Sequence, residues 1–145
     1  MRREAGRARD APLAGIRACR ARRTRVTTDS RHTLPVAANL LRRDFAAPAA
    51  NRKWAADITY IATSEGWLYL AVVLDLFSRR IVGWAMQPTL ERALGLNALA
   101  MALQQRPRAA LVHHSDRGSQ YACSDYQACL AAAGIQCSEP PRRLL

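Results

Sequence analysis

Three apolar segments separated by short turns are the feature that most restricts the fold of this sequence. Residues 54–63 (WAADITYIAT) are rich in β-branched and aromatic residues, residues 67–75 (WLYLAVVLD) are apolar on both faces, and residues 81–86 (IVGWAM) form a third apolar run. Only a few residues separate each segment from the next. Connections this short predict an antiparallel meander of three strands.

The second half of the sequence alternates helical and strand patterns. Residues 90–105 carry leucine, alanine and methionine at helical spacing, and residues 111–114 form a fourth short strand. Ser124 is expected to cap a second helix that runs to Ala133, and residues 135–137 are a stunted fifth strand. The order β-β-β-α-β-α-β predicts an α/β fold with helices packed on a mixed sheet of about five strands. The helix before the fourth strand allows a crossover that sets this strand parallel beside the first.

Two aspartates would become neighbours in such a sheet. Asp57 lies inside the first strand, and Asp116 follows the fourth strand at its carboxyl end, where open α/β sheets hold ligands. Two ionised carboxylates repel each other unless a cation lies between them, and oxygen ligands suit Mg²⁺ or Mn²⁺. Such a centre can act on a phosphodiester. Structural roles stay equally open: Asp57 bonded to backbone amides, and Asp116 as the cap of an Asp-x-Gly turn.

The positive charge is concentrated before residue 54. The chain has a net charge of +11, of which residues 1–53 contribute +10 and residues 54–145 contribute +1. A basic arm on a nearly neutral body favours a polyanionic partner, most often a nucleic acid, over a tail that serves only solubility. Arginine outnumbers lysine 21 to 1, which is typical of GC-rich coding sequences and is weak evidence for phosphate chemistry.

Cysteine spacing and hydropathy exclude several other classes. The four cysteines, at positions 19, 123, 129 and 137, form no C-x-x-C pair, which argues against a zinc ribbon or a redox motif and for reduced thiols. No apolar run is long enough to span a bilayer, and no apolar segment follows the arginine-rich N-terminus as in a secretory signal.

For other residues near the two aspartates, a structural role is weighed against a functional one. His114 shares a strand face with Asp116 and could hydrogen-bond it, but a strand-end histidine with a structural partner fits equally, and neither His113 nor His114 is taken as a ligand. Asp75 is expected to cap a turn or to form an ion pair with Arg79 or Arg80. The aromatic residues of the strands are expected to pack in the core rather than to stack on bases: Trp54, Trp67, Tyr69 and Trp84.

Three blocks of the sequence, WAADITYI, EGWLYLAVVLDLFSRRIVGWAM and HHSDRGSQY, resemble the integrase catalytic core of IS3-type insertion-sequence transposases, in the retroviral-integrase-like superfamily. The resemblance runs from about Thr27 to about Cys137. It implies a ribonuclease-H-like fold and DNA cleavage and strand transfer with Mg²⁺ or Mn²⁺, by two aspartates and one glutamate. Asp57 matches the first of these catalytic and metal-holding carboxylates, and Asp116 matches the second.

The third carboxylate of that family is not expected in this chain. In the family it lies in a DNAxxE-like block on a helix well downstream of the second aspartate, whereas the sequence ends at Leu145. Glu139 lies too early to take its place. The tail SEPPRRLL departs from the family pattern, which suggests a frameshift or premature stop. The C-terminal helices are then missing, one sheet face is uncovered, and strand transfer is impaired or absent.

The resemblance also implies a domain layout and partners. We expect a basic arm and linker over residues 1–50, left from a preceding DNA-binding region, an incomplete integrase-like core over residues 51–137, and a divergent tail over residues 138–145. The expected partner is DNA, both the element ends and the target, in the bacterial cytoplasm at the nucleoid. No membrane contact is expected. Self-association or association with intact transposase is expected. The expected DNA contacts are Lys53, Arg117, Gln120, Arg22, Arg23 and Arg25.

Two alternatives to a transposase core remain. One is a non-catalytic nucleic-acid-binding remnant that interferes with intact transposase. The other is a ribonuclease-H-like nuclease, which would need further acidic residues. Metal-dependent stabilisation through Asp57 and Asp116 would favour a catalytic centre, whereas salt-sensitive DNA binding that ignores metal would favour the remnant.

Overall fold

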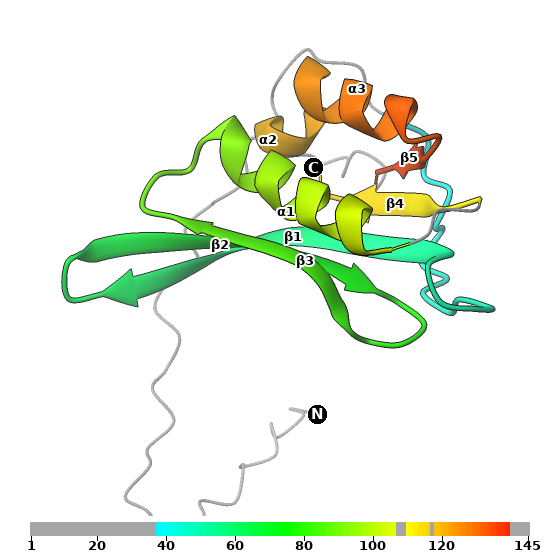
Figure 1. Cartoon of the computed structure of the whole chain (residues 1–145), viewed down its shortest axis with the longest axis horizontal. Coiled ribbons are helices and arrows are strands. Elements are labelled where there is room, and N and C mark those ends of the chain that lie inside the picture. The colour runs from blue at the N-terminus through cyan, green and yellow to red at the C-terminus, as the bar shows by residue number, and fades with distance from the viewer. Residues whose placement is uncertain (1–36, 107–109, 117, 140–145) are drawn as a thin grey trace, which may run out of the picture.

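A five-stranded mixed sheet forms the centre of the protein in the computed structural model, which describes residues 37–106, 110–116 and 118–139. The strand order across the sheet is β3-β2-β1-β4-β5 (Figure 1). The strands are β1 (Lys53–Thr63), β2 (Gly66–Asp75), β3 (Ile81–Gln87), β4 (Val112–Ser115) and β5 (Gln136–Ser138). The predicted strand order along the chain and the mixed sheet are confirmed, with strand ends shifted by at most one residue.

The first three strands form the predicted antiparallel meander. β1 pairs with β2 from Trp54 opposite Asp75 to Thr63 opposite Gly66, and β2 pairs in turn with β3. Gly66 opens β2 at φ +127°, a backbone conformation that side chains disfavour. At the other end of β2, the Asp75 carboxylate accepts hydrogen bonds from the Ser78 and Asn51 backbone N–H groups, so Asp75 caps the turn as predicted.

The helix α1 (Arg92–Gln105) carries the chain from the edge strand β3 back across the sheet to β4. There β4 pairs parallel with β1, Lys53 opposite Val112 and Ala56 opposite Ser115. This confirms the predicted crossover. β5 continues the sheet beyond β4, also in parallel.

The helix after β4 differs from the prediction. The chain forms two helices there, α2 (Ser119–Ala122) and α3 (Ser124–Ala132), separated by Cys123 in an extended conformation. The expectation that Ser124 is the N-cap is therefore wrong: Ser124 is the first helical residue and Cys123 occupies the cap position, without a side-chain cap bond. Gly134, at φ +68°, lies just past α3, where a left-handed residue commonly ends a helix.

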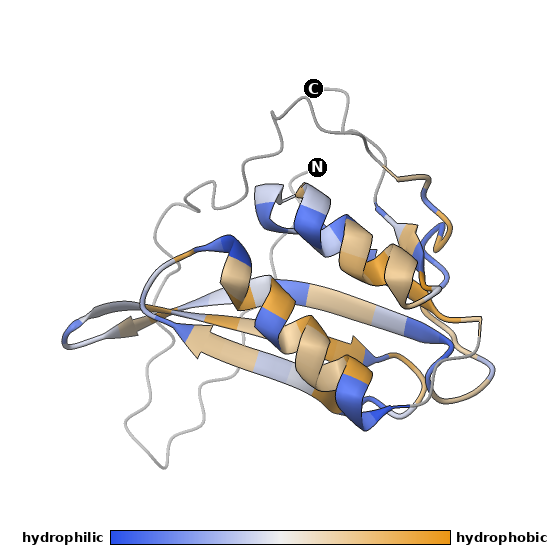
Figure 2. Ribbon diagram, turned by 45° about the horizontal axis from the view of Figure 1, so that its top comes forward, coloured by the Kyte–Doolittle hydropathy of each residue, from blue (hydrophilic) through white to orange (hydrophobic). Residues whose placement is uncertain are grey.

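The helices of the described residues all lie on one face of the sheet (Figure 1). The core forms between them and the sheet, where hydrophobic residues of α1 and α3 meet those of the strands (Figure 2). α1 approaches β3 closely at Gly83, since a Cβ added there would lie 2.1 Å from the Ala98 carbonyl oxygen. No helix among these residues has the length and apolar character needed to cross a membrane.

The opposite face of the sheet carries no helix within the described part of the chain (Figure 1). Trp84 and Met86 pair with Val72 and Leu70 across this face, and both are 48% exposed. Trp67, at the outer end of the β1–β2 hairpin, is 54% exposed. The expectation that Trp67 and Trp84 pack in the core is therefore wrong, because about half of each residue's surface is exposed. Trp54 is fully buried, as predicted.

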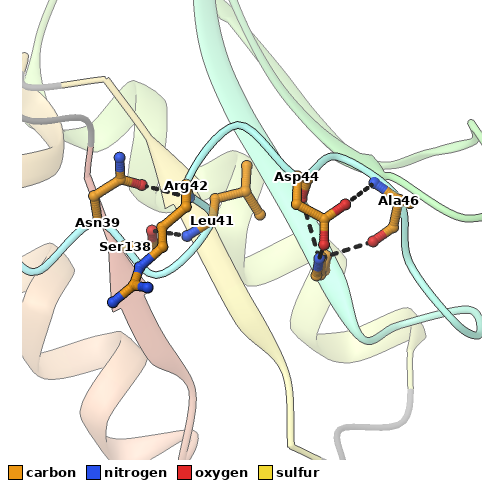
Figure 3. Close-up of polar contacts among 7 residues, drawn as sticks. Asn39, Leu41, Arg42, Asp44, Ala46 and Ser138 are labelled. Carbon is orange, nitrogen blue, oxygen red and sulfur yellow. Dashed lines mark hydrogen bonds and ion pairs between the residues drawn. The ribbon is translucent and has the colours of Figure 1, made fainter.

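Residues 37–46, here called the 37–46 segment, are fastened to the sheet at two points (Figure 3). The backbone N–H groups of Leu40 and Leu41 donate to Ser138 Oγ at 3.0 and 3.2 Å. Further along, the Lys53 ammonium donates to Asp44 Oδ2 at 2.9 Å and to the Ala46 carbonyl oxygen at 2.8 Å. The segment before β1 is thereby held against β5 at one end and against the start of β1 at the other.

Candidate metal centre

Asp57 and Asp116 follow the last paired residues of two neighbouring parallel strands. Ala55 lies opposite His114 and Ala56 opposite Ser115, and the two aspartates are the next residue on each chain. Residues at matching positions of parallel strands present their side chains to the same face. Asp57 also lies opposite Val72, so the Asp57 side chain lies on the face without helices. The sheet topology thus brings together two carboxylates that are distant in the sequence.

The electrostatics of Asp57 reflect this proximity. Partial burial raises the pKa of the Asp57 carboxyl, a hydrogen bond from the Ile58 backbone N–H lowers it, and the negative charge of Asp116 raises it. The negative charge of Asp116 therefore disfavours ionisation of Asp57. A cation between them would reverse that effect, so the pair has the electrostatic character of a cation site.

Asp116 also caps an Asp-x-Gly turn, which is the structural role expected as the alternative to cation binding. Its Oδ1 accepts a hydrogen bond from the Gly118 N–H at 2.9 Å, which makes the Asp-x-Gly turn that leads into α2. This bond fixes one oxygen of the carboxylate toward the backbone. Capping and cation binding are compatible, because a carboxylate has two oxygens and several lone pairs.

The two histidines before Asp116 point in opposite directions. His113 is fully buried, its Nε2 lies 3.0 Å from the Tyr126 hydroxyl, and burial lowers its pKa to about 4. His114 Nδ1 lies 3.0 Å from Ser138 Oγ, so this ring nitrogen has a serine of β5 as its partner. Both histidines therefore have structural hydrogen-bond partners.

Tyr121 is a residue near the aspartates that the sequence patterns did not single out. It lies on α2, is 2% exposed, and its hydroxyl has no hydrogen-bond partner among the described residues. Burial raises its pKa, and the charges of Asp116 and Asp57 raise it further. The only hint in the sequence was its position at the end of HHSDRGSQY.

The expected DNA-contact residues divide into three groups. Gln120 lines a cavity of about 370 Å³ together with Arg92, whose guanidinium is exposed and lies 3.8 Å from an Asp125 oxygen. Lys53 is engaged with Asp44. The remaining arginines lie outside the described residues: Arg22, Arg23, Arg25 and Arg117. Arg92 was not anticipated as part of this cavity.

The donor set suits a hard divalent cation. No group of three or more histidine, cysteine or acidic side chains converges among the described residues, and Glu139 is buried beyond β5 without joining the two aspartates in such a group. The centre therefore offers carboxylate oxygens from two residues. Mg²⁺ commonly takes one or two carboxylates and completes its coordination with water and phosphate oxygens, so Asp57 and Asp116 fit Mg²⁺ or Mn²⁺.

Sequence comparison identifies relatives among bacterial transposases. An integrase core domain family model matches residues 47–139. Transposase InsF for insertion sequence IS3A of Escherichia coli (strain K12) is 52% identical over 116 residues, which cover 79% of this chain and 40% of InsF. This chain therefore spans about two-fifths of the length of that relative.

Solved structures share the fold. The HTLV-2 integrase catalytic core domain in complex with magnesium superposes with a TM-score of 0.59 at 18% identity, over 65% of this chain and 63% of that one. A chain of the simian T-cell lymphotropic virus intasome in complex with PP2A regulatory subunit B56 gamma gives a TM-score of 0.60 at 19% identity, over 75% and 37% of the two chains. These likenesses establish the ribonuclease-H-like fold. The chain belongs to the integrase core domain family, as an integrase catalytic core of the IS3 type.

Proposed function

We propose that this chain carries two carboxylates of a metal-dependent DNA-cleaving and strand-transferring centre, with Asp57 and Asp116 holding Mg²⁺ or Mn²⁺. The observation that carries the proposal is the parallel pairing of β1 with β4, which sets the two aspartates side by side. The raised pKa of Asp57 beside Asp116 supports it, since a cation would relieve the repulsion between the two.

The protein's own residues have separate tasks in this scheme. Asp57 and Asp116 bind the cation in their ionised forms, and the Gly118 N–H orients Asp116 by holding its Oδ1. When bound, a divalent cation supplies positive charge that stabilises the phosphodiester in its transition state. The open sheet face gives DNA access to the carboxylates, since no helix among the described residues covers it (Figure 1).

DNA is the proposed substrate, in the bacterial cytoplasm at the nucleoid. The excess positive charge of residues 1–53 provides non-specific attraction, with Arg22, Arg23 and Arg25 in that arm. Nearer the aspartates, Arg117 and Gln120 follow Asp116 in the sequence, and the Gln120 cavity adds Arg92. Lys53 is the weakest of these candidates, because its ammonium is committed to Asp44 and Ala46.

We further propose that this chain by itself transfers strands weakly. The described residues place two carboxylates together, enough to anchor one cation, whereas a two-metal mechanism needs further oxygen ligands. The exposed Trp84 and Met86 on the open face favour self-association or association with intact transposase.

The test combines cation binding with DNA cleavage. Calorimetric titration with Mn²⁺ should show binding by the unmodified chain and by Glu65→Gln, an exposed carboxylate at the β1–β2 turn, but not by the double variant Asp57→Asn with Asp116→Asn. Cleavage of DNA carrying the element ends should be slow and should depend on the same two aspartates. Salt-sensitive DNA binding without any Mn²⁺ binding would instead identify a non-catalytic DNA-binding protein and contradict the proposal.

A further inference from the structure

Two buried tyrosines pack against each other, and their hydroxyl groups differ in their hydrogen-bond partners. The rings of Tyr121 and Tyr126 meet edge to face, with centroids 5.2 Å apart. The Tyr126 hydroxyl lies 3.0 Å from His113 Nε2, which is a buried hydrogen bond. The Tyr121 hydroxyl is equally buried but has no hydrogen-bond partner among the described residues. A buried hydroxyl without a partner lowers stability, so its presence calls for an explanation.

The backbone of Tyr121 is close to the candidate metal centre along the chain. Tyr121 lies on α2, and its backbone N–H donates to the Gly118 carbonyl oxygen at 3.0 Å. Gly118 in turn donates its own N–H to Asp116 Oδ1. A single short turn therefore links the Tyr121 backbone to the Asp116 carboxylate.

The charges around the two phenols distinguish them further. Beyond the effect of burial, Asp116 and then Asp57 raise the pKa of Tyr121. The charges that raise the pKa of Tyr126 come instead from Tyr121 and from Cys137, Cys129 and Cys123. The Tyr121 hydroxyl thus lies within the field of both carboxylates and stays protonated, which makes it a hydrogen-bond donor beside two acceptors.

We propose that Tyr121 is a positioning residue of the metal centre, whose hydroxyl donates a hydrogen bond to the Asp116 carboxylate when Asp116 and Asp57 converge on a divalent cation. Carboxylates that bind metals are commonly held by such outer hydrogen bonds, which fix the ligand's orientation. The Gly118 N–H holds one oxygen of Asp116, and Tyr121 supplies a second donor. The inference rests on the proposed metal-binding role of the two aspartates.

The test uses Tyr126→Phe as a matched control for Tyr121→Phe, because each change removes one buried hydroxyl from the same aromatic pair. Mn²⁺ affinity of the full chain is measured from the electron paramagnetic resonance signal of free Mn²⁺, and stability without metal is measured by urea unfolding. Tyr121→Phe should bind Mn²⁺ roughly tenfold more weakly or worse, at equal or higher stability. Tyr126→Phe should lose stability and keep the original Mn²⁺ affinity.

The outcomes separate this inference from the function beneath it. Unchanged Mn²⁺ affinity in Tyr121→Phe overturns the role of Tyr121 while the metal centre stands. A loss of metal-free stability in Tyr121→Phe as large as that in Tyr126→Phe also overturns it, because the hydroxyl would then have a structural partner. Absence of Mn²⁺ binding in the unmodified chain, or equal binding after Asp57→Asn with Asp116→Asn, overturns the metal centre and this inference together.

Discussion

Asp57 on β1 and Asp116 after β4 lie one residue past the last paired positions of two parallel strands, and the charge of Asp116 raises the pKa of Asp57. The fold thus brings two like charges together at the end of the pairing between β1 and β4. Such an arrangement lowers the stability of the metal-free protein, and a bound cation would remove that penalty. Stability and function are therefore expected to oppose each other at this point of the sheet.

We predict that Asp57→Asn raises the urea midpoint of the metal-free protein at pH 7. The folded-state pKa of Asp57 lies above its ordinary value of 3.8, so ionised Asp57 favours the unfolded state at neutral pH. Because the pKa of Asp57 is raised in the folded state, the wild-type protein loses stability as the pH rises through that folded-state pKa. The advantage of the variant should therefore shrink as the pH falls and vanish below about 3.8, where Asp57 is protonated in both states.

Saturating Mn²⁺ should reverse this order, since only the wild-type chain keeps both ligands. Urea unfolding of both proteins at pH 7, with and without Mn²⁺, measures the effect. Glu65→Gln is the control, because Glu65 is an exposed carboxylate away from the aspartate pair. A variant that is less stable than the wild type in the absence of metal would show that Asp57 has a stabilising structural role instead.

Two glycines at the packing surface of α1, one in β3 and one in α1 itself, should respond in opposite directions to the same substitution. At Gly83 a new Cβ would lie 2.1 Å from the Ala98 carbonyl oxygen, so Gly83→Ala must push α1 from β3 and should cost about 1–3 kcal/mol or more. At Gly95, within α1, a new Cβ would lie 3.5 Å from Tyr126 Cε2, an ordinary contact. Gly95→Ala should therefore stabilise the protein by about 0.5–1 kcal/mol, as alanine does inside helices.

Urea unfolding of both variants at neutral pH measures this contrast. Each variant serves as the control for the other, since both add one methyl group at the interface between α1 and its neighbours. Equal effects of the two substitutions would mean that α1 does not pack on β3 at Gly83 as described.

The architecture was largely predictable because its signals are local or follow from chain connectivity. Apolar runs with short connections indicated the meander, and the helical spacing of residues 90–105 indicated α1. The parallel pairing of β4 with β1 followed from the crossover. The neighbouring positions of Asp57 and Asp116 could be inferred from that pairing alone.

What the sequence did not reveal depends on contacts made in three dimensions. The four residues of α2 are too few for a periodic pattern, and an apolar strand does not indicate which face its helices will cover, as Trp84 illustrates. Which of two neighbouring tyrosines obtains a hydrogen-bond partner depends on the position of His113. Likewise, nothing near Leu41 in the sequence indicates that its N–H donates to Ser138.

The buried histidine should make stability fall between pH 6.5 and pH 4. Burial lowers the pKa of His113 from 6.5 to about 4, so between these values the unfolded state binds a proton that the folded state excludes. A shift of this size corresponds to roughly 3 kcal/mol, present above pH 6.5 and lost as the pH falls to the folded pKa. Asp57, whose pKa is raised, contributes a gain in stability as the pH falls, so the net loss of stability is smaller.

Nuclear magnetic resonance of the histidine Cε1 proton gives the His113 pKa directly in the wild-type protein. As the pH is lowered, the resonance of His113 should stay at its neutral position down to about pH 5. The resonance of His114 should begin to shift at a higher pH, because His114 is only half-buried. Titration of His113 near 6.5 would show that its ring reaches solvent.

Ser138 should be more important to stability than its size suggests, because three groups use its hydroxyl. Its Oγ accepts the N–H groups of Leu40 and Leu41 and lies 3.0 Å from His114 Nδ1. Since both N–H groups donate to Oγ, the serine proton is left for the imidazole.

Ser138→Ala leaves these groups without partners at a partly buried site, which should cost about 1–3 kcal/mol in urea unfolding. It should also speed proteolysis within the 37–46 segment, which would lose its attachment to β5. Asn39→Ala is the matched control, because Asn39 Oδ1 accepts the Arg42 N–H at an exposed site. Its loss should have a much smaller effect on both measurements. Equal effects of the two substitutions would mean that the segment is held by Lys53 and Asp44 alone.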